Sequence, residues 1–205
     1  MTGRRELTLT VLTNAGKALT TGRVFVAAVT DDRQFKNKPD DPSTPSIDGD
    51  VTKLSATDKD RMIGRQRNSF GHAMGDVSLA ANDSVNKQIR SLIEQSLHRK
   101  GYQLTQDSDA PNVMTISTKE FWSWMTPGFV ALIFEAKIQC AITVTNATGS
   151  HTVIVNGYGL NHGQFAKDVN FVEAFDPAYA DFLVNFAANV DNLGLLPDVT
   201  GNSPH

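Results

Sequence analysis

The sequence predicts an α+β fold in which two amphipathic helices pack on one face of an antiparallel, or else mixed, β-sheet. Residues 134–145 alternate between apolar and polar side chains, which is the period of a strand with one wet face. Residues 85–97 and 179–190 instead carry apolar side chains at helical spacing. Because 205 residues with 40% hydrophobic content can bury one sizeable core, we expect a single domain over residues 1–205.

The N-terminal part is expected to supply strands on either side of a long polar loop. Glu6–Leu12 alternates apolar and polar residues, and Arg23–Val29 is a shorter, more apolar run. From about residue 34 to 60, prolines and polar residues replace apolar ones, which predicts a long surface loop or a partly disordered insert. Glycines and alternate apolar residues between 61 and 79 favour short extended pieces at a sheet edge. A frayed tail is expected over about residues 197–205.

Capping signals place the ends of the two helices. Asn82 or Asp83 is expected to cap the first helix, and Gly101 is placed as the residue after its end. Asp176 is expected to cap the second helix, with Pro177 at its first position. Proline is tolerated there because the first turn has no N–H bond to lose.

Residues 129–160 give the clearest signal, two strand-like runs joined by a loop. The five residues 146–150, NATGS, predict a loop longer than the tightest two-residue hairpin. The apolar side of the first run, which includes Cys140, is assigned to the sheet face under the helices, so this cysteine is interpreted as a small buried hydrophobe. Residues 138–166 contain no Asp, Glu, Lys or Arg, but polar residues and glycines interrupt them, which favours a hairpin over a transmembrane helix.

A strand at Val113–Lys119 leads into an aromatic cluster, the first part of a candidate binding surface. Its members are Trp122, Trp124 and Phe129, with a turn signal at Pro127–Gly128. Exposed rings there would face a membrane interface or another protein. Packing of the same rings in the core is the slightly favoured interpretation.

A basic segment is the second part of the candidate surface. Arg61, Arg65 and Arg67 stand close in sequence to Phe70. Guanidinium groups in this position would hold a carboxylate or phosphate group of a partner. The favoured alternative is that these arginines pair with acids of the preceding loop and with the two aspartates that end the second strand.

Composition and motifs argue against several classes of function. A net charge of −3 supplies no broad basic field for phosphates, so nucleic acid is not an expected partner. There is no Gly-x-Ser-x-Gly, phosphate loop or dinucleotide fingerprint, so neither catalytic residues nor a cofactor are predicted. His72 and Asp76 lack a third ligand at zinc spacing, so no metal site is predicted either. An enzyme would need a pocket that gathers Asp31, Asp32, His72 or Asp76.

The order of several weak features resembles a known family. These features are Val29-Thr30-Asp31-Asp32-Arg33, Ile63-Gly64 followed by Arg67-Asn68-Ser69-Phe70-Gly71, an amphipathic helix closing at Gly101-Tyr102, and a Phe134–Thr145 strand paired with a second strand before a final helix. In this order they resemble the YajG-type lipoproteins of Gram-negative bacteria, over residues 24–193.

The resemblance implies export to the periplasm and a lipid anchor on an N-terminal cysteine, with no catalytic residues to carry over. The sequence departs from the pattern in two ways, because Cys140 lies in a strand and is no lipobox cysteine, and because the insert is long. The first residues, MTGRRELTLT, contain no apolar run of signal-peptide type. The leader and its anchor are therefore expected upstream of this sequence.

The function expected from these observations is that of a non-enzymatic periplasmic domain, anchored to the outer membrane in its full-length form. It would act as an accessory or binding module for an envelope protein or a membrane surface. The alternative is a small-molecule or lipid-binding domain, with an apolar pocket between the Trp-bearing strand end and a helix stripe of Tyr179, Phe182 and Phe186. A homo-oligomer through the edge strand Glu6–Leu12 is a further expectation.

Overall fold

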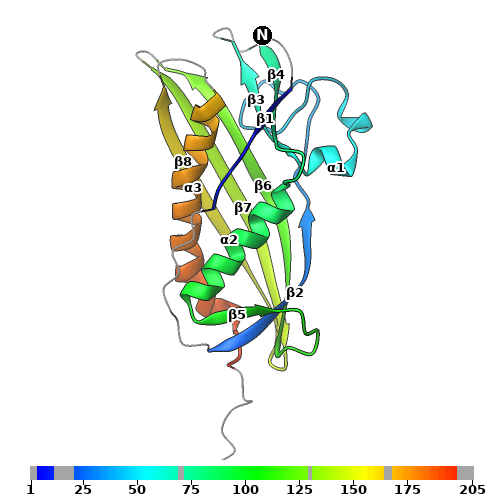
Figure 1. Cartoon of the computed structure of the whole chain (residues 1–205), viewed down its shortest axis with the longest axis vertical. Coiled ribbons are helices and arrows are strands. Elements are labelled where there is room, and N and C mark those ends of the chain that lie inside the picture. Colours follow the sequence, from blue (N-terminus) through cyan, green and yellow to red (C-terminus); the bar gives the residue numbers. More distant parts are fainter. Residues whose placement is uncertain (1–3, 12–20, 69–71, 129–130, 164–167, 198–205) are drawn as a thin grey trace, which may run out of the picture.

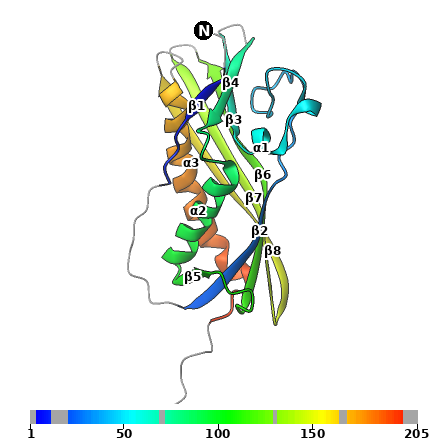
Figure 2. The same ribbon diagram turned by 45° about the vertical axis from the view of Figure 1, so that its right-hand side comes forward.

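A computed structural model describes residues 4–11, 21–68, 72–128, 131–163 and 168–197 of the chain. These residues form one eight-stranded sheet, with two long helices on one face and an irregular insert on the other (Figures 1 and 2). The strands are β1 Arg5–Leu7, β2 Gly22–Asp31, β3 Met62–Arg67, β4 Ala73–Leu79, β5 Tyr102–Thr105, β6 Asn112–Pro127, β7 Leu132–Asn146 and β8 Gly149–Gly163. The helices are α1 Ala56–Lys59, α2 Val85–Arg99 and α3 Asp168–Asn189, with 3-10 turns η1 Val51–Lys53 and η2 Val190–Leu193.

Strand β6 is the centre of the sheet. Along one side it pairs antiparallel with β7, which pairs in turn with β8. Its other side is shared: the first half pairs parallel with β2, and Ser123 in the second half pairs parallel with Gly64 of β3. Strand β5 lies parallel to β2, β4 lies antiparallel to β3, and β1 lies parallel to β4 at the end of the sheet.

The sheet is therefore mixed, which confirms the alternative that the sequence left open, and the favoured prediction of an antiparallel sheet is wrong. Four of the seven pairings between described strands are parallel. Parallel strands need a long crossover connection, and here α2 belongs to the crossover that brings β5 alongside β2. Alternating polarity along a strand gives its wet and dry faces and carries no information about its direction.

The two amphipathic helices pack on one face of the sheet, as predicted (Figure 1). Gly101 follows α2 with a positive φ of 84°, again as predicted. The N-cap of α2 is Ser84, not Asn82 or Asp83, and its hydroxyl accepts a hydrogen bond from the backbone N–H of Lys87. The short helix α1 and the 3-10 turns were not predicted, because they are too brief to show a period.

Helix α3 begins eight residues before the predicted cap, so Asp176 and Pro177 lie inside it. The helix lies directly on glycines of β8. A Cβ atom built on Gly159 would lie 2.5 Å from the amide nitrogen of Ala178, and one on Gly157 would lie 2.8 Å from the Cβ atom of Phe182. Tight packing on this glycine row holds the helix despite the missing N–H of the proline.

The hairpin places its faces as predicted. The dry side of β7 is fully buried and comprises Phe134, Ala136, Ile138, Cys140, Ile142 and Val144. The predicted five-residue loop is wrong, because Asn146 already pairs with Gly149 and only residues 147 and 148 form the turn. The side chain of Asn146 accepts hydrogen bonds from the N–H and the hydroxyl of Thr148, and Gly149 supplies a φ of 131°.

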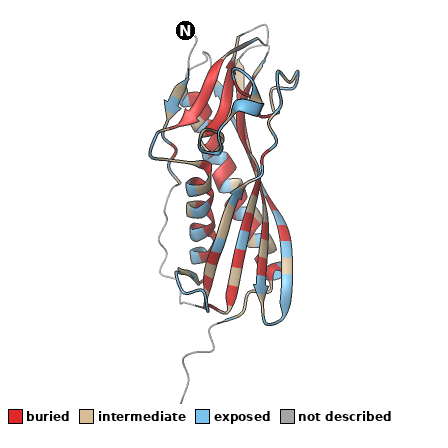
Figure 3. Cartoon of the chain, turned by 90° about the vertical axis from the view of Figure 1, so that its right-hand side faces the viewer, coloured by how far each residue is buried: buried red, intermediate tan, exposed pale blue. Residues whose placement is uncertain are grey.

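The insert, residues 32–61, covers the half of the opposite face that lies over β3 and the end of β6 (Figure 2). It forms a second, smaller core in which Ile47, Met62, Trp122 and Trp124 are buried. Figure 3 shows that the remaining half of this face is open, with buried and exposed residues alternating along its strands. No helix in the described ranges is long and apolar enough to cross a membrane.

Candidate functional site

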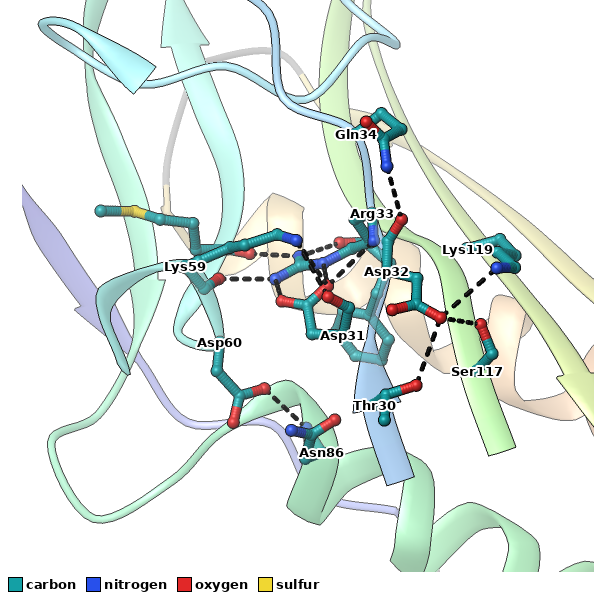
Figure 4. A network of polar contacts seen from close by, with 12 residues as sticks. Thr30, Asp31, Asp32, Arg33, Gln34, Lys59, Asp60, Asn86, Ser117 and Lys119 are labelled. Carbon is teal, nitrogen blue, oxygen red and sulfur yellow. Dashed lines mark hydrogen bonds and ion pairs between the residues drawn. The ribbon is translucent and has the colours of Figure 1, made fainter. Parts of the chain in front are cut away.

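A dense network of polar contacts lies where β2 ends and the insert begins (Figure 4). Its centre is Arg33, whose side chain is 0% exposed. Nε and Nη2 donate to the carboxylate of Asp31 at 2.8 and 2.7 Å. Nη1 donates to the carbonyls of Met62 and Phe121 at 2.5 and 2.8 Å, and Nη2 also reaches the carbonyl of Lys59 at 2.6 Å. All five guanidinium donors are therefore used. We call Arg33 and Asp31 the clamp.

The clamp is joined to the smaller core through one aromatic ring. The guanidinium carbon of Arg33 lies 5.2 Å from the centre of the Phe35 ring, and Lys59 Nζ lies 5.9 Å from the same centre. Phe35 meets Trp122 edge to face at 5.8 Å, and the indole N–H of Trp122 donates to the carbonyl of Pro42 at 3.1 Å. The clamp thus ties β2, β3 and β6 to both ends of the insert.

Two open hollows flank the clamp. The first, about 410 Å³, lies between the insert and the sheet and contains Asp32, Lys119, Glu120 and Lys137. A hydrogen bond from the Ser117 hydroxyl, assisted by Lys119 at 3.4 Å, holds the pKa of Asp32 below its usual value. Lys137 and Glu120 form a second ion pair at 3.3 Å. The charges in this hollow therefore largely neutralise one another.

The second hollow, about 620 Å³, lies at the N-terminus of α2. Asp60 stands there, and its carboxylate accepts the N–H of Asn86 at 2.9 Å while its carbonyl accepts the N–H of Val85. Burial raises the pKa of Asp60, and the hydrogen bond from Asn86 only partly offsets this effect. Asp60 therefore acts as an additional cap on α2, which stabilises the crossover helix against the sheet.

Two predicted members of the candidate surface, Trp122 and Trp124, are buried in the smaller core, 0% and 8% exposed. Their burial confirms the favoured interpretation, which packed these rings in the core. The other interpretation, an exposed aromatic patch formed by these two rings, is wrong. Phe70 and Phe129 lie outside the described residues. The insert covers the tryptophans with scattered apolar residues that show no period, which is why their burial was hard to predict from the sequence.

The arginines of the candidate surface are bound within the chain. Arg61 pairs with Glu6 at 2.5 Å, and its guanidinium also reaches the carbonyl of Leu79. Arg65 is buried between Asp48 at 3.1 Å and Asp76 at 3.8 Å. Pairing with a loop acid is therefore confirmed for Arg65, and Arg61 and Arg67 also lie close enough to the loop acids Asp58 and Asp41 to lower the pKa of each carboxyl.

Arg67 Nη2 donates to the carbonyl of Pro39 at 3.2 Å, so this arginine also contacts the insert. Pairing of the three arginines with Asp31 and Asp32 is wrong, because those carboxylates are bound by the clamp and by Lys119.

The four residues that an enzyme would have to gather are not brought together. Asp31 is bound by Arg33, and Asp32 is bound by Ser117 and Lys119. Asp76 accepts the N–H of Asp48 at 2.9 Å, and His72 is exposed beyond β3. Within the described residues, no group of three His, Cys, Asp or Glu side chains is arranged to hold a metal ion.

The predicted apolar pocket between the Trp-bearing strand end and the stripe of α3 is also wrong. The tryptophans and the α3 stripe lie on opposite faces of the sheet, and Phe182 and Phe186 are fully buried. Phe121 stacks on Phe175 with ring centres 4.7 Å apart, which fills the space between the sheet and the helix.

Arg33 was missed as a central residue, although one signal was present. Asp31 and Arg33 are two residues apart in extended chain, so their side chains point the same way and can form a two-point ion pair. The remaining acceptors of Arg33 are backbone carbonyls, which leave no trace in the sequence.

A family model described as "Uncharacterized lipoprotein" matches residues 43–174. None of the curated proteins matches the chain.

Among solved structures, an uncharacterized protein has a TM-score of 0.44 at 10% identity, covering 92% of this chain and 98% of its own. Protein XCC0632 from Xanthomonas campestris has a TM-score of 0.46 at 11% identity, covering 92% and 97%. The hypothetical protein CT253 from Chlamydia trachomatis has a TM-score of 0.35 at 9% identity, covering 53% and 86%. Structural likeness at this level says nothing about function.

Proposed function

This chain belongs to a family of uncharacterized lipoproteins, and from that membership we propose that it is the globular domain of a lipid-anchored envelope protein that works as a non-enzymatic binding module. In this proposal the domain stands in the periplasm, anchored to the outer membrane, and its partner is another envelope protein. Family membership is the observation that carries the proposal.

The chemistry of the candidate site supports a binding module over an enzyme. A catalytic group needs a reactive atom directed at a substrate, whereas the donors of Arg33 and the carboxylate of Asp31 are directed at each other and at the chain. Cys140 is buried, and burial raises the pKa of its thiol to about 12. These groups hold the fold in place.

An exposed apolar stripe on β8 supports a protein partner. Ile154, Tyr158 and Leu160 are 50%, 46% and 40% exposed on the face turned away from α3. The edge of β8 is partly blocked, because Asp181 accepts the N–H of Tyr158 and Asn185 donates to the carbonyl of residue 156. A partner would therefore contact the open face of the strand and not extend the sheet.

The anchor is tested by expressing the gene with its own upstream sequence in a Gram-negative host fed with an alkyne-labelled palmitate. The expected result is a labelled protein that sediments with the outer membrane. Unlabelled protein in the cytoplasm would contradict the anchor and the compartment together.

The partner surface is tested by placing a photo-crosslinking amino acid at Ile154 in the same cells. Position Glu94, exposed on α2 at the opposite face of the sheet, is the matched control. One discrete adduct from position 154 and none from position 94 is the expected pattern. Equal adducts from both positions would show non-specific contact and remove the support from the stripe.

A further inference from the structure

A separate groove lies between α2, α3 and the chain after β1, on the side of the helices away from the sheet. It has a volume of about 300 Å³, at the lower end of the range for ligand pockets. Its wall contains Val11, Leu183 and Val184, of which Val184 is 67% exposed. Arg99 of α2 and Asp176 of α3 stand at its rim, and neither has an ion-pair partner within the described chain.

One buried group in this groove has no explanation in the fold. Gln95 is only 8% exposed, yet both its amide nitrogen and its amide oxygen have no hydrogen-bond partner among the described residues. Gln88, two turns earlier on the same helix, shows the contrast. Its amide contacts the carbonyl of Leu9, the carboxylate of Asp83 and the hydroxyl of Tyr179. Buried amides are normally satisfied in this way, so the bare amide of Gln95 indicates a missing partner.

We propose that the groove binds a short extended peptide segment of a partner protein, whose backbone amide pairs with the side chain of Gln95. A primary amide offers N–H donors and a carbonyl acceptor side by side, and a peptide unit offers the complementary acceptor and donor. The apolar wall of Leu183 and Val184 takes one side chain of the segment. Arg99 and Asp176 supply charges of opposite sign at the rim for its flanking residues.

The chemistry of Gln95 favours a peptide over the main alternative ligand, a fatty acid. A fatty acid would place its chain on the apolar wall, and its carboxylate would accept bonds from the amide N–H and from Arg99. At neutral pH a carboxylate has no proton to donate, so the carbonyl oxygen of Gln95 would stay buried without a donor. A peptide satisfies both atoms of the amide.

The inference does not depend on the lipid anchor or on the β8 stripe. The groove and the stripe lie on opposite sides of the sheet, so loss of one binding activity leaves the other measurable. Failure of the anchor experiment would likewise leave the groove in place.

The test selects ligands from a phage-displayed library of random heptapeptides on the wild-type domain, with synthetic copies measured by calorimetry. The expected result is one family of peptides that binds the wild type and Glu94→Gln equally. Gln95→Leu should bind the same peptides about tenfold more weakly, the effect of losing one or two hydrogen bonds. Val184→Lys, which alters an exposed wall position, should weaken binding without affecting folding.

Nuclear magnetic resonance supplies the second readout. The side-chain amide signals of Gln95, identified by their absence in Gln95→Leu, should shift on addition of the selected peptide and not on addition of octanoate. A library that yields no enriched peptide, or peptides that bind Gln95→Leu as tightly as the wild type, would overturn the proposal. Octanoate shifting these signals more than the peptide does would assign the groove to an acyl chain instead.

Discussion

The two faces of the sheet are covered by different means. On one face, α2 and α3 bury a continuous apolar core, and α3 packs directly onto the glycines of β8. On the other face, the insert covers half of the sheet with few apolar residues and is held by a buried ion pair. The helical face depends on apolar area and close packing, whereas the insert face depends on a few polar contacts that must all be made.

This difference predicts different responses to substitution. When one methyl group is removed on the helical face, the surrounding side chains can move to fill part of the space. The loss in the free energy of unfolding then increases with the volume that stays empty. Loss of the one guanidinium on the insert face removes a hydrogen bond from each of three carbonyls and two from a buried carboxylate at once. Substitutions on the two faces should therefore differ in their effect on stability.

Cys140→Asp should have the largest effect, because it places a carboxylate at the centre of the apolar core. Cys140 is fully buried, and the raised pKa of its thiol, about 12, shows how strongly this position disfavours an anion. We expect a loss of several kcal/mol in the free energy of unfolding, measured by urea denaturation.

Ala141→Asp is the matched control for this substitution, one residue away on the wet side of the same strand. Its cost should be about 0.5 kcal/mol or less. Near-native stability of Cys140→Asp would mean that the two faces of β7 had been reversed.

Arg33→Met should have the next largest effect, and it tests the insert face. The substitution removes the guanidinium from Asp31, whose side chain is 8% exposed, and leaves this carboxylate only the backbone N–H of residue 33 and Lys59 at 3.9 Å. It also removes the side-chain donor from three carbonyls. Removing one member of a buried pair costs about 3–5 kcal/mol. The insert should also become sensitive to protease, with cleavage between residues 34 and 60 appearing before the helical face is lost.

Lys119→Met is the control for the clamp, because Lys119 and Asp32 are both 45% exposed. Loss of this surface pair should cost about 0–1 kcal/mol. If Arg33→Met and Lys119→Met were equally mild, the clamp would have no special role, and the smaller core alone would hold the insert.

The helical face was largely predictable from the sequence because its signals are local. The stripe of α2 and the dry side of β7 each repeat with the period of their element. Local patterns did not predict the start of α3 correctly. A proline has a strong preference for the first turn of a helix. Contacts of α3 with Gly157 and Gly159 of the preceding strand outweigh that preference, and they depend on tertiary packing that no local pattern shows.

The insert face was not predictable, since its contacts join the ends of side chains to distant backbone. Arg33 bonds to the carbonyls of Lys59, Met62 and Phe121, and a carbonyl is the same in every residue. Composition predicts a polar loop at residues 34–60, but it gives no sign that this segment buries Trp122. The candidate site therefore becomes visible only in the folded chain.

Two substitutions on the helical face, Gln88→Leu and Gln95→Leu, should differ in their effect on the free energy of unfolding. This difference should be smaller than the loss expected for Arg33→Met. Gln88→Leu removes the partner of Tyr179 and of Asp83, so a loss of about 1–3 kcal/mol is expected. Gln95→Leu removes an amide without a partner and should be neutral or stabilising. Chemical denaturation of both variants measures the difference, and equal losses would mean that Gln95 is already satisfied within the fold.

Two carboxylates beside the clamp should give the smallest effects, with opposite dependence on pH. Burial raises the pKa of Asp60 above its ordinary value of 3.8, so the native state holds this proton more tightly than the unfolded chain does. Its contribution to stability is fully present below pH 3.8 and is lost as the pH rises through the raised pKa. The stability of Asp60→Asn relative to the wild type should therefore be higher at neutral pH than at acid pH. The difference should be less than about 1 kcal/mol, because Asp60 is partly exposed.

Asp32 should behave in the opposite way. The Ser117 hydroxyl and Lys119 lower its pKa, so its contribution is present above 3.8 and is lost as the pH falls through the lowered pKa. Asp32→Asn should lose stability at neutral pH and approach the wild type in acid. Unfolding curves of both variants across this range give two slopes. Each slope is the change with pH in the stability difference between variant and wild type. Slopes of the same sign would show that Asp60 and Asp32 do not have different local environments, and that both carboxylates respond only to the net charge of the domain.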